Sequence, residues 1–256
     1  MKIHITLIAY ALPVSPLIRT LAGPDTTFHL FLHSDNAEVI EDIERYVLPH
    51  YNTVYHAIGE NRGLAASWND GLIESQQTRA DVMIIANDDI SMDRADLRTL
   101  SQGALTHRDT GVIICQGYDG NMHRQQQLQH VVFAINPIAI EKIGYFDENF
   151  FPIYFEDTDY SRRCGLAGVT YYDAGPTGIQ HRGSTTIKTN SNLYTQNNTT
   201  FQKNRDYYIR KWGGEPGKET AVFPFGNEDF GYRIAEDYRH NPYREFDRID
   251  REIVKL

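Results

Sequence analysis

Three carboxylates crowd into the stretch FPIYFEDTDYSRR, directly behind an aromatic run. Glu156, Asp157 and Asp159 repel one another unless cations or separate roles relieve the repulsion, and Arg162 or Arg163 is close enough in sequence to pair with one of them. Partly dry surroundings raise the pKa of a carboxyl group and make it a better base. We expect one structural carboxylate, one that caps a helix and one free for chemistry. The alternative is that these residues simply begin a helix, whose dipole favours acidic side chains in the first turn. We expect this structural role for Asp159 even if another of the three carboxylates is catalytic.

A second acidic group lies in the stretch MIIANDDIS. Here Asp88 and Asp89 follow an apolar run that we expect to be a buried strand. Carboxylate oxygens are the ligands that Mg²⁺ and Mn²⁺ prefer, and both ions keep positions open for substrate phosphates. His181 follows a later strand, and a neutral imidazole suits Mn²⁺. The alternatives are a polar turn with an Asp cap and a surface or core histidine.

A third polar group surrounds the start of an expected helix, in GENRGLAASWNDGL. Gly63 permits a tight turn, and the helix behind it presents free N–H groups to an anion. Asn61 and Asn69 could face one ligand, or the segment could be a simple helix N-terminus. Asp35 ends another strand, and ligands of parallel α/β sheets bind at the carboxyl ends of strands.

Strands and helices alternate through about residue 117, which predicts an α/β domain with a largely parallel sheet. Residues 80–90 have a continuous apolar core, typical of a strand covered on both faces. We expect strands at 2–10, 27–33, 51–59, 80–90 and 110–118, and helices at 16–23, 37–50, 64–77 and 94–105.

The second half of the chain is less regular. We expect strands at 130–136 and 169–175, and helices at 137–144, at 162–168 and within 189–214. Residues 216–256 form a charged, aromatic extension that we expect to pack on its own domain; it could instead stack on sugars or cover a neighbouring subunit.

Composition limits the classes of function. The 256 residues suit one sizeable domain, and an apolar content of 41% is enough for a core. A net charge of −9 argues against a long nucleic acid as partner. Two cysteines make no disulfide framework, which predicts a reducing, cytoplasmic setting. The N-terminal apolar run is too short for a signal peptide or a membrane span.

The ordered series SDN, NRGLAASWNDG, IIANDDI, IGYFDENFFPIYFEDTDYSRRCGLAG, HRGST and NRDYYIRKWG resembles the family 2 glycosyltransferases. It is most similar to the rhamnosyltransferase-like branch, and the fourth block is the specific one. The resemblance covers roughly residues 1–215 and implies the GT-A fold, Rossmann-like with helices on both sides of a mostly parallel sheet. Residues 1–117 would be the nucleotide-sugar-binding half and 118–215 the acceptor and catalytic half.

The resemblance also implies roles for single residues. The reaction would be transfer of a sugar from a nucleotide-sugar donor to an acceptor hydroxyl, with inversion at the anomeric carbon. Asp157 is then the general base, with Glu156 and Arg163 in the same catalytic block. Asp89 and His181 would bind Mn²⁺ or Mg²⁺. The expected donor-binding residues are Tyr10, Asp35, Asn61, Arg62, Asn69 and Asp88.

One departure concerns the acidic motif, which reads Asn-Asp-Asp and so lacks a carboxylate at its first position. We favour a UDP-sugar as donor, with a dTDP-sugar second. The acceptor could be a glycan, a protein, a small molecule or a modified nucleobase. Two alternatives remain open, a sugar nucleotidyltransferase and a non-catalytic glycan- or nucleotide-binding module, although the chain lacks the Gly-rich N-terminal loop of the former. The oligomeric state is not predicted.

Overall fold

The computed structural model describes residues 1–125, 130–183, 191–237 and 239. Within this part, one nine-stranded sheet has the order β3-β2-β1-β4-β8-β6-β9-β5, with β7 paired to β6. The strands are β1 (Ile3–Ala9), β2 (Thr26–Leu32), β3 (Thr53–Ala57), β4 (Val82–Asn87), β5 (Ile90–Ser91), β6 (Val112–Asp119), β7 (Arg124–Gln125), β8 (Val132–Ile135) and β9 (Tyr171–His181). The helices are α1 (Ser15–Leu21), α2 (Ala37–Asp42), η1 (Ile43–Val47), α3 (Leu64–Gln77), α4 (Arg94–Thr106), α5 (Pro137–Ile143), α6 (Glu156–Leu166), α8 (Ser191–Trp212), η2 (Pro224–Gly226) and η3 (Glu228–Phe230).

The sheet is largely parallel, as the alternation of strands and helices predicts. Strands β3, β2, β1 and β4 pair in parallel, and so do β6 and β9. Strand β8 runs antiparallel to both β4 and β6, so β6 regains the direction of β4. The carboxyl ends of six strands therefore point the same way and can present side chains to one ligand.

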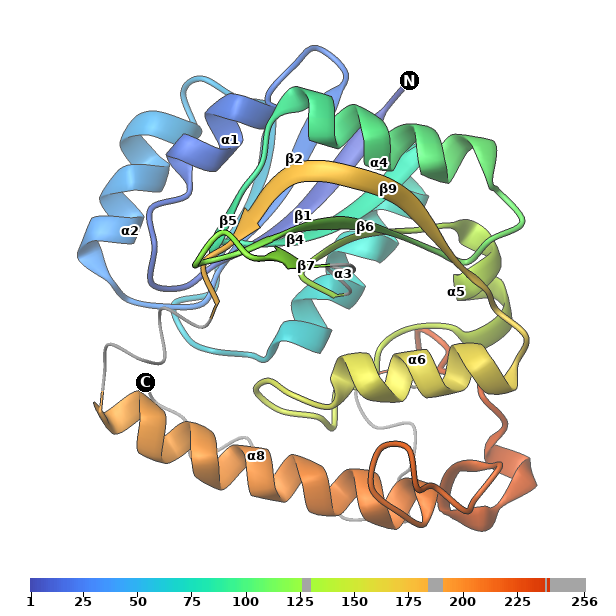
Figure 1. Ribbon diagram of the computed structural model, residues 1–256. Helices are drawn as coiled ribbons and strands as arrows, with labels where there is room; N and C mark the ends of the chain where they lie inside the picture. The colour runs from blue at the N-terminus through green and yellow to red at the C-terminus, as the bar shows by residue number, and fades with distance from the viewer. Residues whose placement is uncertain (126–129, 184–190, 238, 240–256) are drawn as a thin grey trace.

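Helices cover both faces of the sheet (Figure 1). Helices α1, α2 and α4 pack with one set of strand residues, and α3, α5 and α6 pack with the alternate set. Strand β4 shows the alternation clearly, since Ile84 belongs to the first core and Ile85 to the second. A strand covered on both faces needs apolar side chains in both directions, which explains the unbroken apolar run.

The sheet curls back on itself beside β4. Strand β5 follows β4 after a turn containing Asp88 and Asp89, yet it pairs with β9 at the far edge, where Ile90 lies opposite His181. The end of β9 must therefore arch over the carboxyl end of β4, as Figure 1 shows. This curl brings two segments together that are distant in sequence.

Two predicted boundaries are wrong. Helix α6 begins at Glu156 rather than at 162, because the acidic cluster forms its first turn; Phe155, with φ 74°, ends the preceding loop in a left-handed conformation. The strand expected at 169–175 continues to His181. Gly175 and Pro176 do not end it, because the pairing of β9 with β6 absorbs register shifts around them.

The C-terminal segment returns to the domain, as predicted, over its described part. Ile234 is 1% exposed, and its backbone accepts a hydrogen bond from Tyr145 N and donates one to Ile143 O. Only glycine fits at position 144, because a Cβ there would lie 1.7 Å from Ile234 O. The expectations for 240–256 lie outside the described residues. No helix in the described ranges has both the length and the apolar character needed to cross a membrane.

Candidate functional site at the carboxyl ends of the strands

The curl of the sheet pairs Asp89 with His181. Asp89 Oδ2 lies 3.1 Å from His181 Nε2, and the two side chains are 12% and 26% exposed. One carboxylate and one imidazole are a suitable start for a Mn²⁺ or Mg²⁺ site. The described residues contain no cluster of three or more His, Cys, Asp or Glu that could hold a metal alone. A cation here would have to complete its ligands from substrate and water, as Mg²⁺ commonly does.

Asp88 turns away from this pair toward the end of β1. Its Oδ2 accepts a hydrogen bond of 3.1 Å from the backbone N–H of Tyr10. Burial raises the pKa of Asp88 to about 6, the N–H of Tyr10 opposes the rise, and the Asp89 carboxylate adds to it. The two adjacent carboxylates thus have different surroundings and can serve different functions.

Two further donor-site candidates lie beside Asp88. Tyr10 directly follows β1, and its backbone carbonyl accepts a hydrogen bond of 2.6 Å from Ser34 Oγ. Burial raises the pKa of the Tyr10 hydroxyl to about 12, and the Asp35 carboxylate contributes. Asp35 is exposed. The fold therefore places Tyr10, Asp35 and Asp88 just beyond the ends of the neighbouring strands β1, β2 and β4.

The loop before α3 is held by its own side chains. Asn61 Oδ1 accepts a hydrogen bond of 2.9 Å from Gly63 N, and Arg62 Nη2 lies 2.7 Å from Asp70 Oδ2. Gly63 has φ 89°, and a Cβ there would lie 2.9 Å from the ring of Phe151. The close approach explains the glycine and places this loop against the aromatic run before α6.

Asn69 is used inside the protein. Asn69 is 0% exposed. Its Nδ2 donates hydrogen bonds to Phe146 O at 3.0 Å and to Glu148 Oε1 at 2.9 Å. Its Oδ1 accepts from Phe146 N at 2.8 Å. The structure therefore does not bring Asn69 to a face shared with Asn61; it joins α3 to the segment before the aromatic run.

The carboxylates at the start of α6 separate by exposure. Glu156 is 3% exposed, and burial, with the neighbouring Asp157 second, raises the pKa of Glu156 well above its usual range. The Asp157 side chain is 39% exposed. Its Oδ1 accepts a hydrogen bond of 2.7 Å from Thr158 N. Of the three carboxylates, Asp157 is the one available to a substrate.

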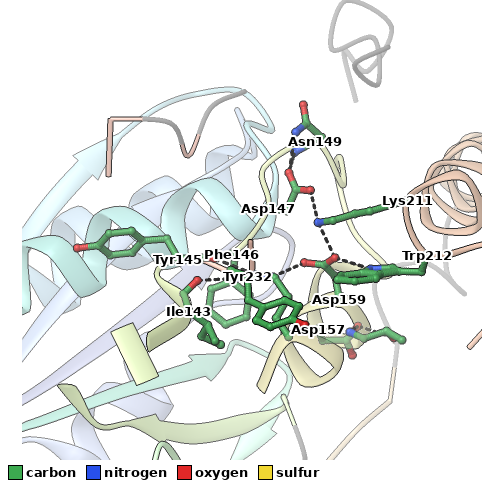
Figure 2. Close-up of polar contacts among 12 residues, drawn as sticks. Ile143, Tyr145, Phe146, Asp147, Asn149, Asp157, Asp159, Lys211, Trp212 and Tyr232 are labelled. Carbon is green, nitrogen blue, oxygen red and sulfur yellow. Dashed lines mark hydrogen bonds and ion pairs between the residues drawn. The ribbon is translucent and has the colours of Figure 1, made fainter. Parts of the chain in front are cut away.

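Asp159 is structural, as expected, and lies in a fully buried ionic network. Its Oδ1 is 2.6 Å from Lys211 Nζ and accepts 2.9 Å from Trp212 Nε1, while Arg163 Nε donates to Oδ2 at 2.8 Å. Lys211 also contacts Asp147 Oδ2 at 2.8 Å. Figure 2 shows Asp159 and Asp147 converging on Lys211. The network fastens α6 to the end of α8.

Arg163 belongs to this network rather than to an open surface. Its guanidinium has 0% exposure and donates to Ile143 O at 2.8 Å and to Tyr145 O at 2.9 Å, besides Asp159. These contacts support a part in holding α6 and the segment before it. Because the Arg163 guanidinium is buried, a substrate cannot reach it.

Two buried side chains, His130 and Lys211, contact the acidic residues of this region, and no sequence pattern indicates either of them. Lys211 lies in a quoted motif, but helical periodicity alone does not show that a lysine is buried. His130 ends a polar stretch with no motif around it. Its Nδ1 lies 4.0 Å from Asp157 Oδ2.

A buried histidine beside the Asn61–Arg62 loop predicts a dependence of stability on pH. His33 is 2% exposed and lies 2.7 Å from Ser67 Oγ; burial, with Arg62 second, lowers its pKa from 6.5 to about 4, although Asn61 opposes the change. Between these pH values the unfolded chain binds a proton that the folded chain does not, so stability falls as pH falls. His33→Gln should remove a slope of about 1.4 kcal/mol per pH unit.

Urea unfolding of both proteins at intervals from pH 7 to pH 4.5 checks this expectation. The variant should gain stability relative to the natural protein as pH falls below 6.5, the ordinary pKa of the group. His123→Gln is the matched control, because its side chain is 78% exposed. Parallel pH curves for His33→Gln and the natural protein would contradict the assignment.

Comparison with known proteins places this geometry in context. No family model matches the chain. A galactofuranosyl glycosyltransferase of Leishmania donovani is 32% identical over 78 residues, which is 30% of this chain and 17% of that protein. The matched stretch is thus a small part of that relative's length.

Solved structures share more of the chain at lower identity. TarS of S. aureus, residues 1–349, has a TM-score of 0.56 at 12% identity, covering 71% of this chain and 60% of that one. A mannosyltransferase of Pyrobaculum calidifontis, in complex with GDP-Man and Mn²⁺, has 0.53 at 12%, covering 72% and 57%. GalNAc-T7, with UDP, GalNAc and Mn²⁺, has 0.58 at 12%, covering 93% and 55%. These likenesses, together with the curled, mostly parallel sheet, show that the chain has the GT-A fold.

Proposed function

We propose that this protein is a metal-dependent, inverting glycosyltransferase that moves a sugar from a nucleotide-sugar donor to an acceptor hydroxyl. The observation that carries the proposal is the Asp89–His181 pair, 3.1 Å apart at the carboxyl ends of the strands. A pair of this kind leaves most ligand positions of a cation to a diphosphate. A UDP-sugar is the favoured donor and a dTDP-sugar the second. The rhamnosyltransferase-like affiliation remains a proposal from the motif order.

Different residues would bind the donor and activate the acceptor. Tyr10, Asp35 and Asp88 form the donor side with the Asn61–Arg62 loop. A divalent cation held by Asp89 and His181 would neutralise charge on the leaving diphosphate. Asp157, the exposed carboxylate of its cluster, takes the proton of the acceptor hydroxyl as that oxygen bonds to the anomeric carbon.

The compared proteins support the substrate class. One structure of TarS is a complex with UDP, the mannosyltransferase structure holds GDP-Man and Mn²⁺, and the GalNAc-T7 structure holds UDP, GalNAc and Mn²⁺. The partial relative is named for galactofuranosyl transfer. A nucleoside diphosphate group is common to the three structures, and Mn²⁺ accompanies it in two of them.

Donor hydrolysis in the absence of an acceptor tests the proposal. UDP-glucose, UDP-galactose, UDP-galactofuranose, UDP-GalNAc, GDP-mannose and dTDP-rhamnose would be incubated with Mn²⁺, Mg²⁺ or EDTA, and released nucleoside diphosphate would be measured. We expect turnover of one donor, abolished by EDTA and reduced at least about 100-fold in Asp89→Asn, because the cation loses its carboxylate.

Asp81→Asn is the control for this experiment, because Asp81 precedes β4 at the amino end of the strand and its side chain is 46% exposed. Binding of a nucleotide without hydrolysis would favour a binding module or an enzyme that requires its acceptor. Absence of both binding and hydrolysis with every donor and metal contradicts the proposal.

A further inference from the structure

A buried imidazole lies directly behind the proposed base. The His130 side chain is 5% exposed, and its Nδ1 is 4.0 Å from Oδ2 of Asp157. The ring packs edge-on against Phe133 at 5.0 Å and Tyr171 at 6.3 Å between centroids. His130 therefore has an aromatic wall on one side and a carboxylate on the other.

The two oxygens of Asp157 have different surroundings. Oδ1 accepts from Thr158 N at 2.7 Å and from Thr158 Oγ1 at 3.2 Å. Oδ2 faces His130. Thr158 therefore holds Oδ1, and His130 is the neighbour that can orient Oδ2.

The neighbours of His130 also select a tautomer. A carboxylate oxygen accepts hydrogen bonds only, so a hydrogen bond between the two groups requires the hydrogen on the nitrogen that faces Asp157. The other nitrogen, Nε2, is buried and has no hydrogen-bond partner among the described residues. Burial lowers the pKa of His130 to about 4, although Asp157 opposes this, so the ring is neutral near pH 7. A neutral ring has one hydrogen to place, and Nδ1 is the ring nitrogen that faces an acceptor.

We propose that His130 is a positioning residue for Asp157, directing Nδ1–H at Oδ2 and thereby holding the carboxylate in the orientation that accepts the proton of the acceptor hydroxyl. The 4.0 Å separation shortens when the acceptor is bound, since catalytic hydrogen bonds are often long in the absence of substrate. The proposal rests on the proposed function, in which Asp157 is the base.

Nitrogen-15 NMR of the histidine rings at pH 7 tests the contact without any substrate. The His130 signals, assigned from their loss in His130→Asn, should show a protonated Nδ1 and a bare Nε2. In Asp157→Ala the hydrogen should move to Nε2, which is the nitrogen that histidine usually protonates. A hydrogen on Nε2 in the natural protein, or spectra unchanged by Asp157→Ala, overturns the proposal.

Donor hydrolysis provides the second measurement, on whichever nucleotide sugar of the panel is turned over. His130→Phe should lower kcat up to about 100-fold with KM for the donor unchanged, the effect of a catalytic group misplaced by about 1 Å. His130→Asn should keep activity within about threefold of the natural protein, because its amide N–H occupies the place of Nδ1–H. Equal losses in both variants, or no loss in His130→Phe, contradict the proposal.

The two measurements separate failure of this inference from failure of the proposed function. If no donor is hydrolysed, the nitrogen-15 spectra still show whether His130 Nδ1 carries the hydrogen that faces Asp157. If a donor is hydrolysed but the spectra show the hydrogen on Nε2, the proposed transferase function is supported and the positioning role of His130 is contradicted.

Discussion

Asp157→Asn is expected to reduce glycosyl transfer by about 10²–10⁴-fold while leaving nucleotide binding unchanged. An acceptor hydroxyl is a weak nucleophile, and its proton must leave as the new bond forms. An amide cannot take that proton, yet it keeps the size of the carboxylate and its hydrogen bond from Thr158. Because the side chain is 39% exposed, the substitution should not disturb the core.

Glu156→Gln is the matched comparison for this prediction. Burial, with Asp157 second, raises the pKa of Glu156 well above its usual range, so its protonated form resembles a glutamine in shape and charge. We expect this variant to keep transfer within about tenfold of the natural rate, the allowance for losing one hydroxyl group. Calorimetric titration with UDP and Mn²⁺ would verify that both variants bind nucleotide. Loss of transfer in Glu156→Gln with activity retained in Asp157→Asn would exchange the two roles.

The sequence predicts the sheet well because its signals are local. The apolar run of β4 and the alternation of strands with helices depend on neighbouring residues, and the described structure confirms both. The start of α6 was harder to predict, because aromatic residues before it have no regular period. The carboxylates themselves mark that start, as acidic groups favour the first turn of a helix.

Positions within the candidate site were predictable only where strand ends converge. Asp89 and His181 meet because β5 pairs with β9. Asp89 lies near the end of its expected strand, whereas His181 ends a strand that was expected to stop at residue 175. Asn69 differs, because an amide one helical turn beyond a loop can face either the ligand or the core. Here its partners are Phe146 and Glu148, from a segment distant in sequence. No local pattern specifies such a partner.

The network around Lys211 has the same origin and gives the second large prediction. Lys211→Met should lower the free energy of unfolding by about 3–5 kcal/mol, because it leaves buried carboxylates without their cation. Asp147 and Asp159 both contact Lys211 Nζ, and all three side chains have 0% exposure. Arg163 still pairs with Asp159, so Asp147 is the carboxylate left with the larger deficit.

Urea unfolding of Lys211→Met and Lys203→Met measures this cost. Lys203 lies exposed on the same helix α8, so its replacement should change stability by less than about 0.5 kcal/mol. Asp147→Asn in the Lys211→Met background should recover part of the loss, because it removes the uncompensated charge. A loss below about 1 kcal/mol in Lys211→Met, the size of an exposed ion pair, would contradict the network's importance.

Acid supplies an internal check on the same variants. Burial alone would raise the pKa of Asp159, but Lys211 and Arg163 outweigh it and hold that pKa below its usual value. The stabilisation is therefore present above the ordinary pKa of 3.8 and is lost as pH falls through the lower folded value. The difference between Lys211→Met and the natural protein should shrink at this acidic limit, since protonated carboxyl groups no longer need the lysine. A difference that stays constant in acid would assign the loss to packing of the lysine stem instead.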